Sequence, residues 1–313
     1  MYQSTYIIIN PNCHQGRGWK RWLSIKNDVL KQIPSAKELV TENGIDLNDQ
    51  LSGLLQSNNE ICLISAGGDG SIHYLVNMLL RSGGTGTPKV TLGAIGLGSS
   101  NDFLKPFQST IKNIPVRINI AKPTLLHDAG RVLYTDEKNI RKEKFFIVNA
   151  SFGATAQGNW NFNNPGKLLK WLKKNSTAAA INYTAITTIL SYNNSFCSMS
   201  FNGEEKYTAI SNINILKIPY VSGSLHYKQA ILPDDGKLGL NICINMSKRE
   251  LLQTLFNLEK GRFIETEKKI STYTDSFHLV SKTPIVFECD GETEKATDVQ
   301  VSVIPQAIKL LHN

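Results

Sequence analysis

The chain has 313 residues, more than a single hydrophobic core usually supports, so the length predicts two domains. A net charge of +8 predicts an anionic partner, and five scattered cysteines predict a reducing compartment and exclude a cysteine-based zinc site. Neither an apolar run of about 20 residues nor a signal peptide is visible, so we expect a cytoplasmic protein. No nucleic-acid recognition module appears, so we expect no nucleic-acid partner.

The N-terminal third predicts strands that alternate with helices. Residues 6–9 predict a buried parallel strand, and residues 10–18 form the loop that leaves it. A helix follows, and a further apolar pair at residues 39–40 precedes Thr41. This alternation favours an α/β domain with a mostly parallel sheet.

The strongest signal is an apolar run over residues 61–66 that ends in Gly67, Gly68, Asp69, Gly70 and Ser71. The run predicts a buried strand, and the helical spacing of the apolar residues after it places these residues at a strand-to-helix turn. Glycines let a ligand approach the backbone, and the start of a helix attracts anions. A carboxylate beside phosphates needs a divalent cation, so the loop predicts a nucleotide with Mg²⁺. The alternative is an ordinary glycine-rich turn.

A second loop of the same kind weakens that alternative. Residues 90–97 again run from an apolar strand into small residues, and Asp102 follows two hydroxyls and an asparagine. The carboxyl ends of neighbouring parallel strands meet at one edge of a sheet, so Asp69 and Asp102 could face one site. Asp102 could also simply cap a short helix.

Several motifs occur in a fixed order along the chain: the Asn-Pro pair at residues 10–11, the two glycine loops at 67–71 and 98–103, and the segments 146–153, 234–238 and 290–292. Taken together, this ordered set resembles the diacylglycerol kinase catalytic family, which includes sphingosine and ceramide kinases. The resemblance spans residues 6–292. It implies an NAD kinase/diacylglycerol kinase-like nucleotide-binding domain over residues 1–123. A β-rich antiparallel sandwich that binds lipid is implied over residues 124–295. The tail at residues 296–313, read as a strand and then a short helix, is expected to pack back on the first domain.

The resemblance also implies roles for individual residues. The implied catalytic residues are Asp69, Asp102, Asp128 and Glu292, with Glu292 as the base that deprotonates the acceptor hydroxyl. Asp128 could instead only form a turn, and Glu292 could be a solvated hairpin residue. The implied nucleotide-binding residues are Asn10, Thr41, Gly67, Gly68, Asp69, Gly70, Ser71 and Ser99. For Thr41, a strand-end or capping role is an equal alternative.

Two departures from the family pattern bear on the nucleotide site. The family has Ser-Gly where this chain has Cys13 and His14, and it has Asn-Glu where this chain has His73 and Tyr74. The second departure leaves open a changed nucleotide preference, or a protein that binds nucleotide or lipid without turnover.

The turn at residues 232–237 matches one that holds a structural Mg²⁺ in bacterial members of the family. The implied ligands are the carboxylate of Asp235 and backbone carbonyls of Leu232 and Lys237. An ordinary Asp-Gly turn explains the sequence equally well.

A helix predicted over residues 165–180 places tryptophan and leucines on one arc and Lys167, Lys170, Lys173 and Lys174 on the other. Such a helix suits an anionic membrane surface, or else covers a core as an ordinary surface helix.

The resemblance implies ATP-dependent phosphoryl transfer to a lipid hydroxyl such as that of diacylglycerol, with ATP as co-substrate and Mg²⁺ as cofactor. The alternatives are an NAD kinase-like small-molecule kinase and a non-catalytic regulator. The expected location is cytoplasmic and peripheral, at the inner face of the membrane. A homodimer remains open.

Overall fold

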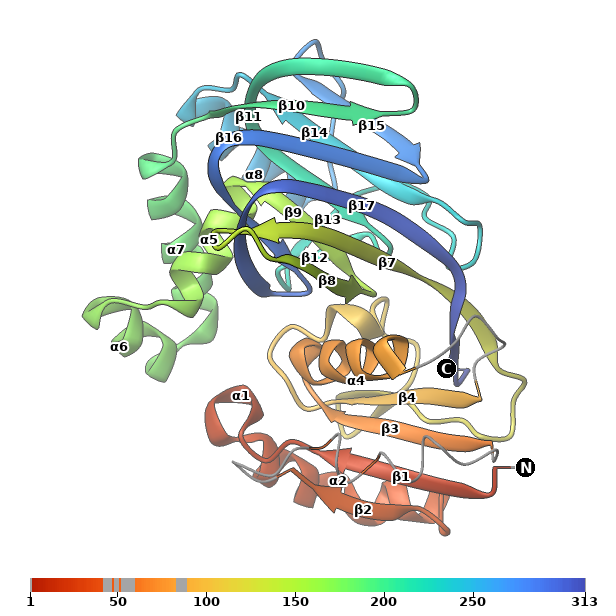
Figure 1. Ribbon diagram of the computed structural model, residues 1–313. Coiled ribbons are helices and arrows are strands. Elements are labelled where there is room, and N and C mark those ends of the chain that lie inside the picture. The colour runs from red at the N-terminus through yellow and green to blue at the C-terminus, as the bar shows by residue number, and fades with distance from the viewer. Residues whose placement is uncertain (1, 42–46, 48–50, 52–59, 83–88, 313) are drawn as a thin grey trace. The chain divides into compact units, whose positions relative to one another are not determined.

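The computed structural model describes residues 2–41, 47, 51, 60–82 and 89–312 (Figure 1). The chain divides into two compact units, which are described separately. The first comprises Met1–Ala129 and Pro305–Asn313, and the second comprises Gly130–Ile304. Both divisions fall a few residues later along the chain than the sequence predicts.

The first unit contains strands and helices in alternation. Its strands are β1 (Ser4–Ile9), β2 (Lys37–Val40), β3 (Ile61–Gly67), β4 (Val90–Gly96), β5 (Thr110–Ile111), β6 (Ile114–Arg117) and the end of β17 (Glu292–Leu310). Its described helices are α1 (Cys13–Gly16), α2 (Gly18–Gln32), α4 (Asp69–Ser82) and the 3₁₀ helix η1 (Asp102–Leu104).

Strand pairing in this unit places three loops at one edge. Strands β2, β1, β3 and β4 lie in that order and pair in parallel, and the end of β17 also pairs in parallel with β4. Strand β6 pairs antiparallel with β4 and β5. All seven residues of β3 are buried, as expected for a strand covered on both faces. The loops that follow β1, β3 and β4 therefore emerge at the same edge of the sheet.

The core of the first unit forms where α2 packs on the sheet. Trp22, Ile25 and Val29 recur at helical spacing on α2, and each is fully buried with Ile7 and Ile64 of the strands. This one-sided apolar stripe anchors α2 and therefore fixes the loop that connects it to β1.

The second unit is dominated by antiparallel strands. These are β7 (Leu125–Asp136), β8 (Arg141–Phe146), β9 (Asn149–Gly153), β10 (Ser195–Phe201), β11 (Glu204–Leu216), β12 (Tyr220–Val221), β13 (Leu225–His226), β14 (Leu238–Ile244), β15 (Lys269–Thr274), β16 (Ser276–Cys289) and most of β17. Its helices are α5 (Ala154–Asn163), α6 (Lys167–Asn175), α7 (Thr177–Ser191) and α8 (Lys248–Glu259). The two-domain division with a β-rich second part is confirmed.

The long strands β11 and β16 organise this unit. Strand β10 pairs antiparallel with one half of each, and β9 pairs antiparallel with the other half of each. Strands β14 and β15 extend the sheet beyond β11, and β17 extends it beyond β16. Phe152, Phe277 and Phe287 pack with tilted rings in the buried core that these strands share.

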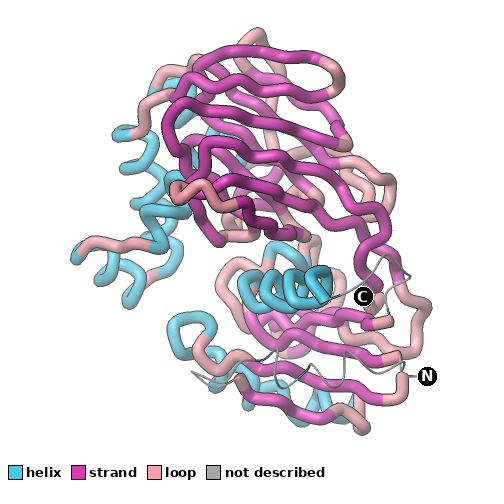
Figure 2. The backbone as a smooth tube through the Cα atoms, in the orientation of Figure 1, coloured by secondary structure: helices cyan, strands magenta, loops and turns pink. Residues whose placement is uncertain are grey.

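Two details of the sequence prediction are wrong. The helix expected over residues 165–180 is interrupted, because α6 ends at Asn175 and the hydroxyl of Ser176 caps a new helix by accepting the N–H of Ala179. Helices α5, α6 and α7 lie together in Figure 2. The tail forms no helix, since β17 continues as a strand to Leu310. No helix in the described residues is long and apolar enough to cross a membrane.

Candidate active site

The two glycine loops are bonded to each other at the edge of the parallel sheet. Strand β3 ends at Gly67, and α4 begins two residues later. The carbonyl oxygen of Gly67 accepts the N–H groups of Leu97 at 2.8 Å and Gly98 at 3.1 Å. The prediction that both loops contribute to one place in the first unit thus has a direct structural basis.

Close approach explains why both loops carry glycine at their contact point. A Cβ on Gly98 would lie 2.5 Å from the Cα of Gly68, and a Cβ on Gly68 would lie 3.2 Å from the Cα of Gly98. Side chains at these positions would push the loops apart. The glycines therefore hold the two loops together as well as leaving room for a ligand.

Asp69 links the loops a second time. Its Oδ1 accepts the N–H of Phe103 at 3.1 Å, so the carboxylate at the start of α4 faces the residue next to Asp102. Asp102 itself is buried, and its Oδ1 lies 2.6 Å from the ammonium of Lys105. The ammonium of Lys105 therefore partly neutralises Asp102.

Asn101 shapes the second loop. Its backbone adopts a left-handed conformation with φ of 52°, and its Oδ1 accepts the N–H of Gly98 at 3.1 Å. Its amide nitrogen donates to the carbonyls of Gly96 and Gly98. Asparagine tolerates this conformation better than most residues, so its role here is to fold the loop. Ser99 is exposed on the same loop.

The end of β1 lies against the first glycine loop. Asn10 donates its side-chain amide to the Oγ of Ser71 at 3.1 Å and its backbone N–H to Ala66. Thr41 lies at the end of β2, where its backbone N–H and its hydroxyl both donate to the carbonyl of Ile9. The structure thus joins Asn10 to the glycine loop, and it gives Thr41 a strand-end hydrogen bond.

Arg21 is a candidate that the sequence analysis missed. From α2 its guanidinium donates to the carbonyls of Gly98 at 3.3 Å and Gly96 at 3.2 Å, and it also contacts the ring of His14 at 3.3 Å. Arg21 therefore places a positive charge beside the second glycine loop and the loop after β1, which suits an anionic ligand. The only signal in the sequence is its position early in the helix after the first loop.

The two departures from the family pattern have different structural consequences. His14 takes φ of 51°, a left-handed conformation that favours the glycine found in the family at this position. His73 is buried and bonds to Asn77 one turn later on α4, whereas Tyr74 is 42% exposed. His73 therefore belongs to the packing of the helix, and Tyr74 is the departure that solvent can reach.

In the second unit, three acids meet at the turn between β16 and β17. Asp290 is buried, and its carboxylate accepts the N–H groups of Ile147, Val148 and Asn149. Glu288 is also buried, and it accepts hydrogen bonds from Ser151, Asn149 and Gly291. Glu292 is exposed at the first position of β17. The two buried acids fix the turn, and the predicted base is the acid that remains available.

The pKa of Glu288 is raised to about 7. Burial is the largest cause, and the nearby charge of Asp290 raises it further, while the hydrogen bonds from Ser151, Gly291 and Asn149 lower it. The sequence analysis passed over Glu288 because a strand glutamate two residues before the Asp-Gly turn has no distinguishing pattern.

Asp128 lies on β7 and is fully buried. Its Oδ1 accepts the N–H of Gln306 at 2.8 Å, where β17 bends with φ of 51°. This contact gives Asp128 a structural role in holding the returning tail within the first unit.

The predicted metal ligands do not form an open site. Asp235 Oδ1 accepts the backbone N–H of Lys237 and also faces the ammonium of Lys217 at 3.1 Å, and Leu232 is 57% exposed. The described residues contain no cluster of three or more His, Cys, Asp or Glu side chains that could hold a metal. A catalytic Mg²⁺ at Asp69 would therefore take most of its ligands from phosphates and water, as Mg²⁺ commonly does beside nucleotides.

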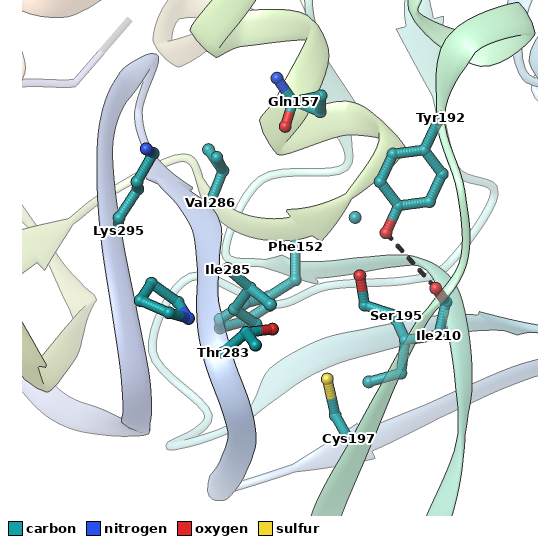
Figure 3. A pocket seen from close by; sticks show the side chains of 12 residues that line it. Phe152, Gln157, Tyr192, Ser195, Cys197, Ile210, Thr283, Ile285, Val286 and Lys295 are labelled. Carbon is teal, nitrogen blue, oxygen red and sulfur yellow. Dashed lines mark hydrogen bonds between the residues drawn. The ribbon is translucent and has the colours of Figure 1, made fainter. Parts of the chain in front are cut away.

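A pocket of about 200 Å³ lies within the second unit. Figure 3 shows Phe152 and Ile285 in the pocket wall, with Lys295 and Tyr192 on different sides. Tyr192 lines the pocket, and its hydroxyl donates to the carbonyl of Ile210 at 3.4 Å. The lining is mixed, because Gln157, Ser195 and Thr283 lie among the apolar side chains.

Two family models match successive parts of the sequence. The diacylglycerol kinase catalytic domain matches residues 4–128, and the YegS C-terminal NAD kinase beta sandwich-like domain matches residues 163–312. The chain belongs to the diacylglycerol kinase catalytic family. Membership in this family makes it a phosphotransferase. Comparison with curated proteins gives no significant match.

Solved structures share the fold over the whole chain. A diacylglycerol kinase from Bacillus anthracis str. Sterne has a TM-score of 0.67 at 15% identity, covering 100% of this chain and 97% of its own. A candidate diacylglycerol kinase from the same organism has a TM-score of 0.71 at 17% identity, covering 100% and 98%. Yeast NADH kinase complexed with NADH has a TM-score of 0.52 at 11% identity, covering 100% and 84%.

Proposed function

We propose that this protein is an ATP-dependent lipid kinase that transfers the γ-phosphoryl group to a lipid hydroxyl, such as that of diacylglycerol. The observation that carries the proposal is the joining of the two glycine loops through Gly67, Gly68 and Asp69 at the carboxyl edge of the parallel sheet. This arrangement combines backbone suited to phosphates with one carboxylate suited to a magnesium nucleotide.

The first unit orients the nucleotide. Gly68 and Gly98 let the two loops touch, so that the start of α4 and the second loop offer backbone groups to the phosphates together. Arg21 adds positive charge next to the second loop, and Asn10 fixes Ser71 at the first. When bound, Mg²⁺ screens the charge of the β- and γ-phosphates. Asp69 is the residue that would hold it or its water ligands.

The second unit supplies the proton acceptor. Glu292 takes the proton from the lipid hydroxyl at its carboxylate, because it is the exposed acid on the β16–β17 turn. Asp290 and Glu288 hold that turn by their hydrogen bonds to backbone N–H groups. The glycine loops belong to the first unit and Glu292 to the second.

The pocket of the second unit supports a lipid acceptor, because its lining combines apolar with polar side chains. Its wall includes Phe152, Ile210 and Ile285, which would cover an acyl chain, and Lys295 would remain near polar or anionic groups. The matched C-terminal family model also fits lipid kinases. Which lipid is phosphorylated is the point that the experiment below decides.

Helix α6 is the proposed membrane contact. Leu168 is 54% exposed and Trp171 is 60% exposed, so the helix turns only Leu169 fully into the unit. Exposed lysines flank these apolar side chains. A tryptophan and a leucine beside lysines suit the interface of an anionic membrane, where the acceptor lipid resides.

The test is a panel of acceptors with γ-labelled ATP and Mg²⁺. The panel contains diacylglycerol, monoacylglycerol, a sphingoid base, ceramide, an isoprenoid alcohol and NAD. Label transfer to one of the lipids is the expected result. Label on NAD alone would replace the proposal with an NAD kinase-like activity, and nucleotide binding without any transfer would replace it with a regulator.

A further inference from the structure

The turn that the family resemblance assigns to a structural Mg²⁺ is contacted by a buried ammonium. Lys217 directly follows β11, and its side chain is 0% exposed. Its Nζ donates to the carbonyl oxygen of Lys237 at 2.8 Å and to Oδ1 of Asp235 at 3.1 Å. These two oxygens are two of the three implied metal ligands.

An ammonium and a Mg²⁺ cannot share these oxygens. Mg²⁺ needs ligands at about 2.0–2.1 Å in octahedral geometry, whereas the ammonium makes hydrogen bonds of ordinary length to them. A metal bound there would also lie next to a full positive charge. The residues present therefore do not fit the metal.

The lysine instead supplies what the metal would supply. It carries a positive charge, and its three N–H donors can bridge several oxygens. A buried charge is tolerated only when it is paired and hydrogen-bonded, and Asp235 and the carbonyl of Lys237 provide both conditions. We infer that Lys217 replaces the structural magnesium of the family with a covalently attached cation, so that this turn folds without metal.

The backbone of Lys217 connects this turn to the candidate active site of the second unit. Its N–H donates to the carbonyl of Val148 at 2.8 Å, and the N–H of Val148 donates to Asp290 at 2.9 Å. Asp290 fixes the turn that carries Glu292. The cation thus holds the 232–237 turn to the same backbone that supports the proposed base.

The first experiment uses the intact wild-type chain without nucleotide. Its magnesium content after dialysis is measured by inductively coupled plasma mass spectrometry, and we expect far less than one ion per chain. We also expect the same melting temperature in EDTA and in millimolar Mg²⁺. One tightly held Mg²⁺ per chain, or a melting temperature that rises with Mg²⁺, would overturn the inference. Neither readout involves kinase activity, so neither depends on the proposed function.

The second experiment uses Lys217→Met, which keeps the stem of the side chain and removes the charge. Loss of the hydrogen bonds to Asp235 and to the carbonyl of Lys237 should lower the melting temperature by roughly 5–10 °C, and added Mg²⁺ should restore part of that loss. The matched control is Lys206→Met on β11, the strand that Lys217 follows, and the ammonium of Lys206 pairs with the exposed Glu204 at 2.7 Å. The control should change little, with or without Mg²⁺.

A double-mutant cycle covers the case in which Lys217→Met does not fold. Asp235→Asn alone leaves the ammonium with weaker partners, and its melting temperature should fall. Combining Asp235→Asn with Lys217→Met should cost less than the sum of the two single changes, because the charges are removed together. Strict additivity would show that the two side chains do not act as a pair, and would overturn the inference.

Discussion

The glycine loops of the first unit and the β16–β17 turn of the second place their proposed functional acids in opposite ways. In the first unit, Asp69 is partly exposed, and its carboxylate accepts the backbone N–H of Phe103 in the neighbouring loop. In the second, two buried acids accept several hydrogen bonds and leave Glu292 exposed. The first arrangement depends on the absence of side chains, and the second depends on buried polar side chains that are fully satisfied.

Because of this difference, substitutions can change the charge and the local structure of each region separately. Replacing Asp69 by asparagine keeps an oxygen that can accept the N–H of Phe103, so the loop contact survives while the negative charge is lost. Replacing Glu288 changes the support of the turn and leaves the charge of Glu292 in place.

Asp69→Asn should reduce kinase activity by on the order of 10³-fold, because a neutral amide attracts Mg²⁺ and its water shell much more weakly than a carboxylate does. Its melting temperature should stay close to that of the wild type. Activity is measured by transfer of label from γ-labelled ATP, and unfolding by circular dichroism. The control is Asp28→Asn, which removes a charge on α2 of the same unit, paired with Lys112. Comparable activity in both variants would exclude Asp69 from the nucleotide site.

Glu292→Gln should reduce phosphoryl transfer by on the order of 10²-fold, since glutamine cannot accept the hydroxyl proton. The affinity for magnesium nucleotide, measured by calorimetry, should not change, because the glycine loops lie in the first unit and Glu292 lies in the second. This pairing of results separates Glu292 from Asp69, whose variant should lose nucleotide affinity as well. Normal turnover would remove Glu292 as the base.

The sequence could indicate the nucleotide loops because their signal is local. Buried strands read as continuous apolar runs, and glycines 67, 68 and 98 lie where two backbones touch. Even there, Arg21 escaped notice, because its contact with the second loop joins positions 77 residues apart.

The interpretation of the 232–237 turn shows the limit of a motif. The turn carries an acid and two carbonyls that could bind a metal, and nothing within it reveals that an ammonium lies on them. That ammonium comes from Lys217, whose position depends on how β11 ends. Glu288 was missed for a similar reason, since burial and three donors distinguish it and neither is visible in a strand sequence. For both Asp235 and Glu288, the environment of the carboxylate depends on residues that are distant in the sequence.

The raised pKa of Glu288 makes the second unit sensitive to pH. The carboxyl has a pKa of about 7 when folded and 4.5 as its ordinary value. Between these values the folded protein keeps a proton that the unfolded chain has released, so the free energy of unfolding should fall as the pH rises. The upper limit of this loss is roughly 3 kcal/mol.

Glu288→Gln should flatten that part of the pH dependence, because the amide does not titrate. Urea denaturation at a series of pH values from about 4.5 to about 7 measures it. Glu259→Gln, at the exposed end of α8, is the matched control and should keep the wild-type slope. An unchanged slope in Glu288→Gln would mean that another group causes the pH dependence.

The smallest expected effect is on membrane binding by α6, and the structure shows which of its lysines are exposed. Lys173 donates to the carbonyl of Phe162 at 3.1 Å and lies 4.1 Å from the centre of its ring, so it helps to hold α6 against α5. Lys167, Lys170 and Lys174 are exposed. Changing these three to glutamine, and leaving Lys173 intact, removes surface charge without disturbing that contact.

The three-lysine variant should bind phosphatidylglycerol vesicles about tenfold more weakly at physiological salt, because each lysine near an anionic surface contributes at most roughly 1 kcal/mol before screening. Sedimentation with vesicles measures binding. Activity should fall on vesicle-borne lipid and not on a short-chain, water-soluble acceptor. The control changes Lys138, Lys260 and Lys282, three other exposed lysines of the second unit, to glutamine and therefore makes the same reduction in net charge. Equal loss in both variants would mean that overall charge drives binding. A loss confined to α6, together with its exposed Trp171 and Leu168, would identify the helix as the membrane contact.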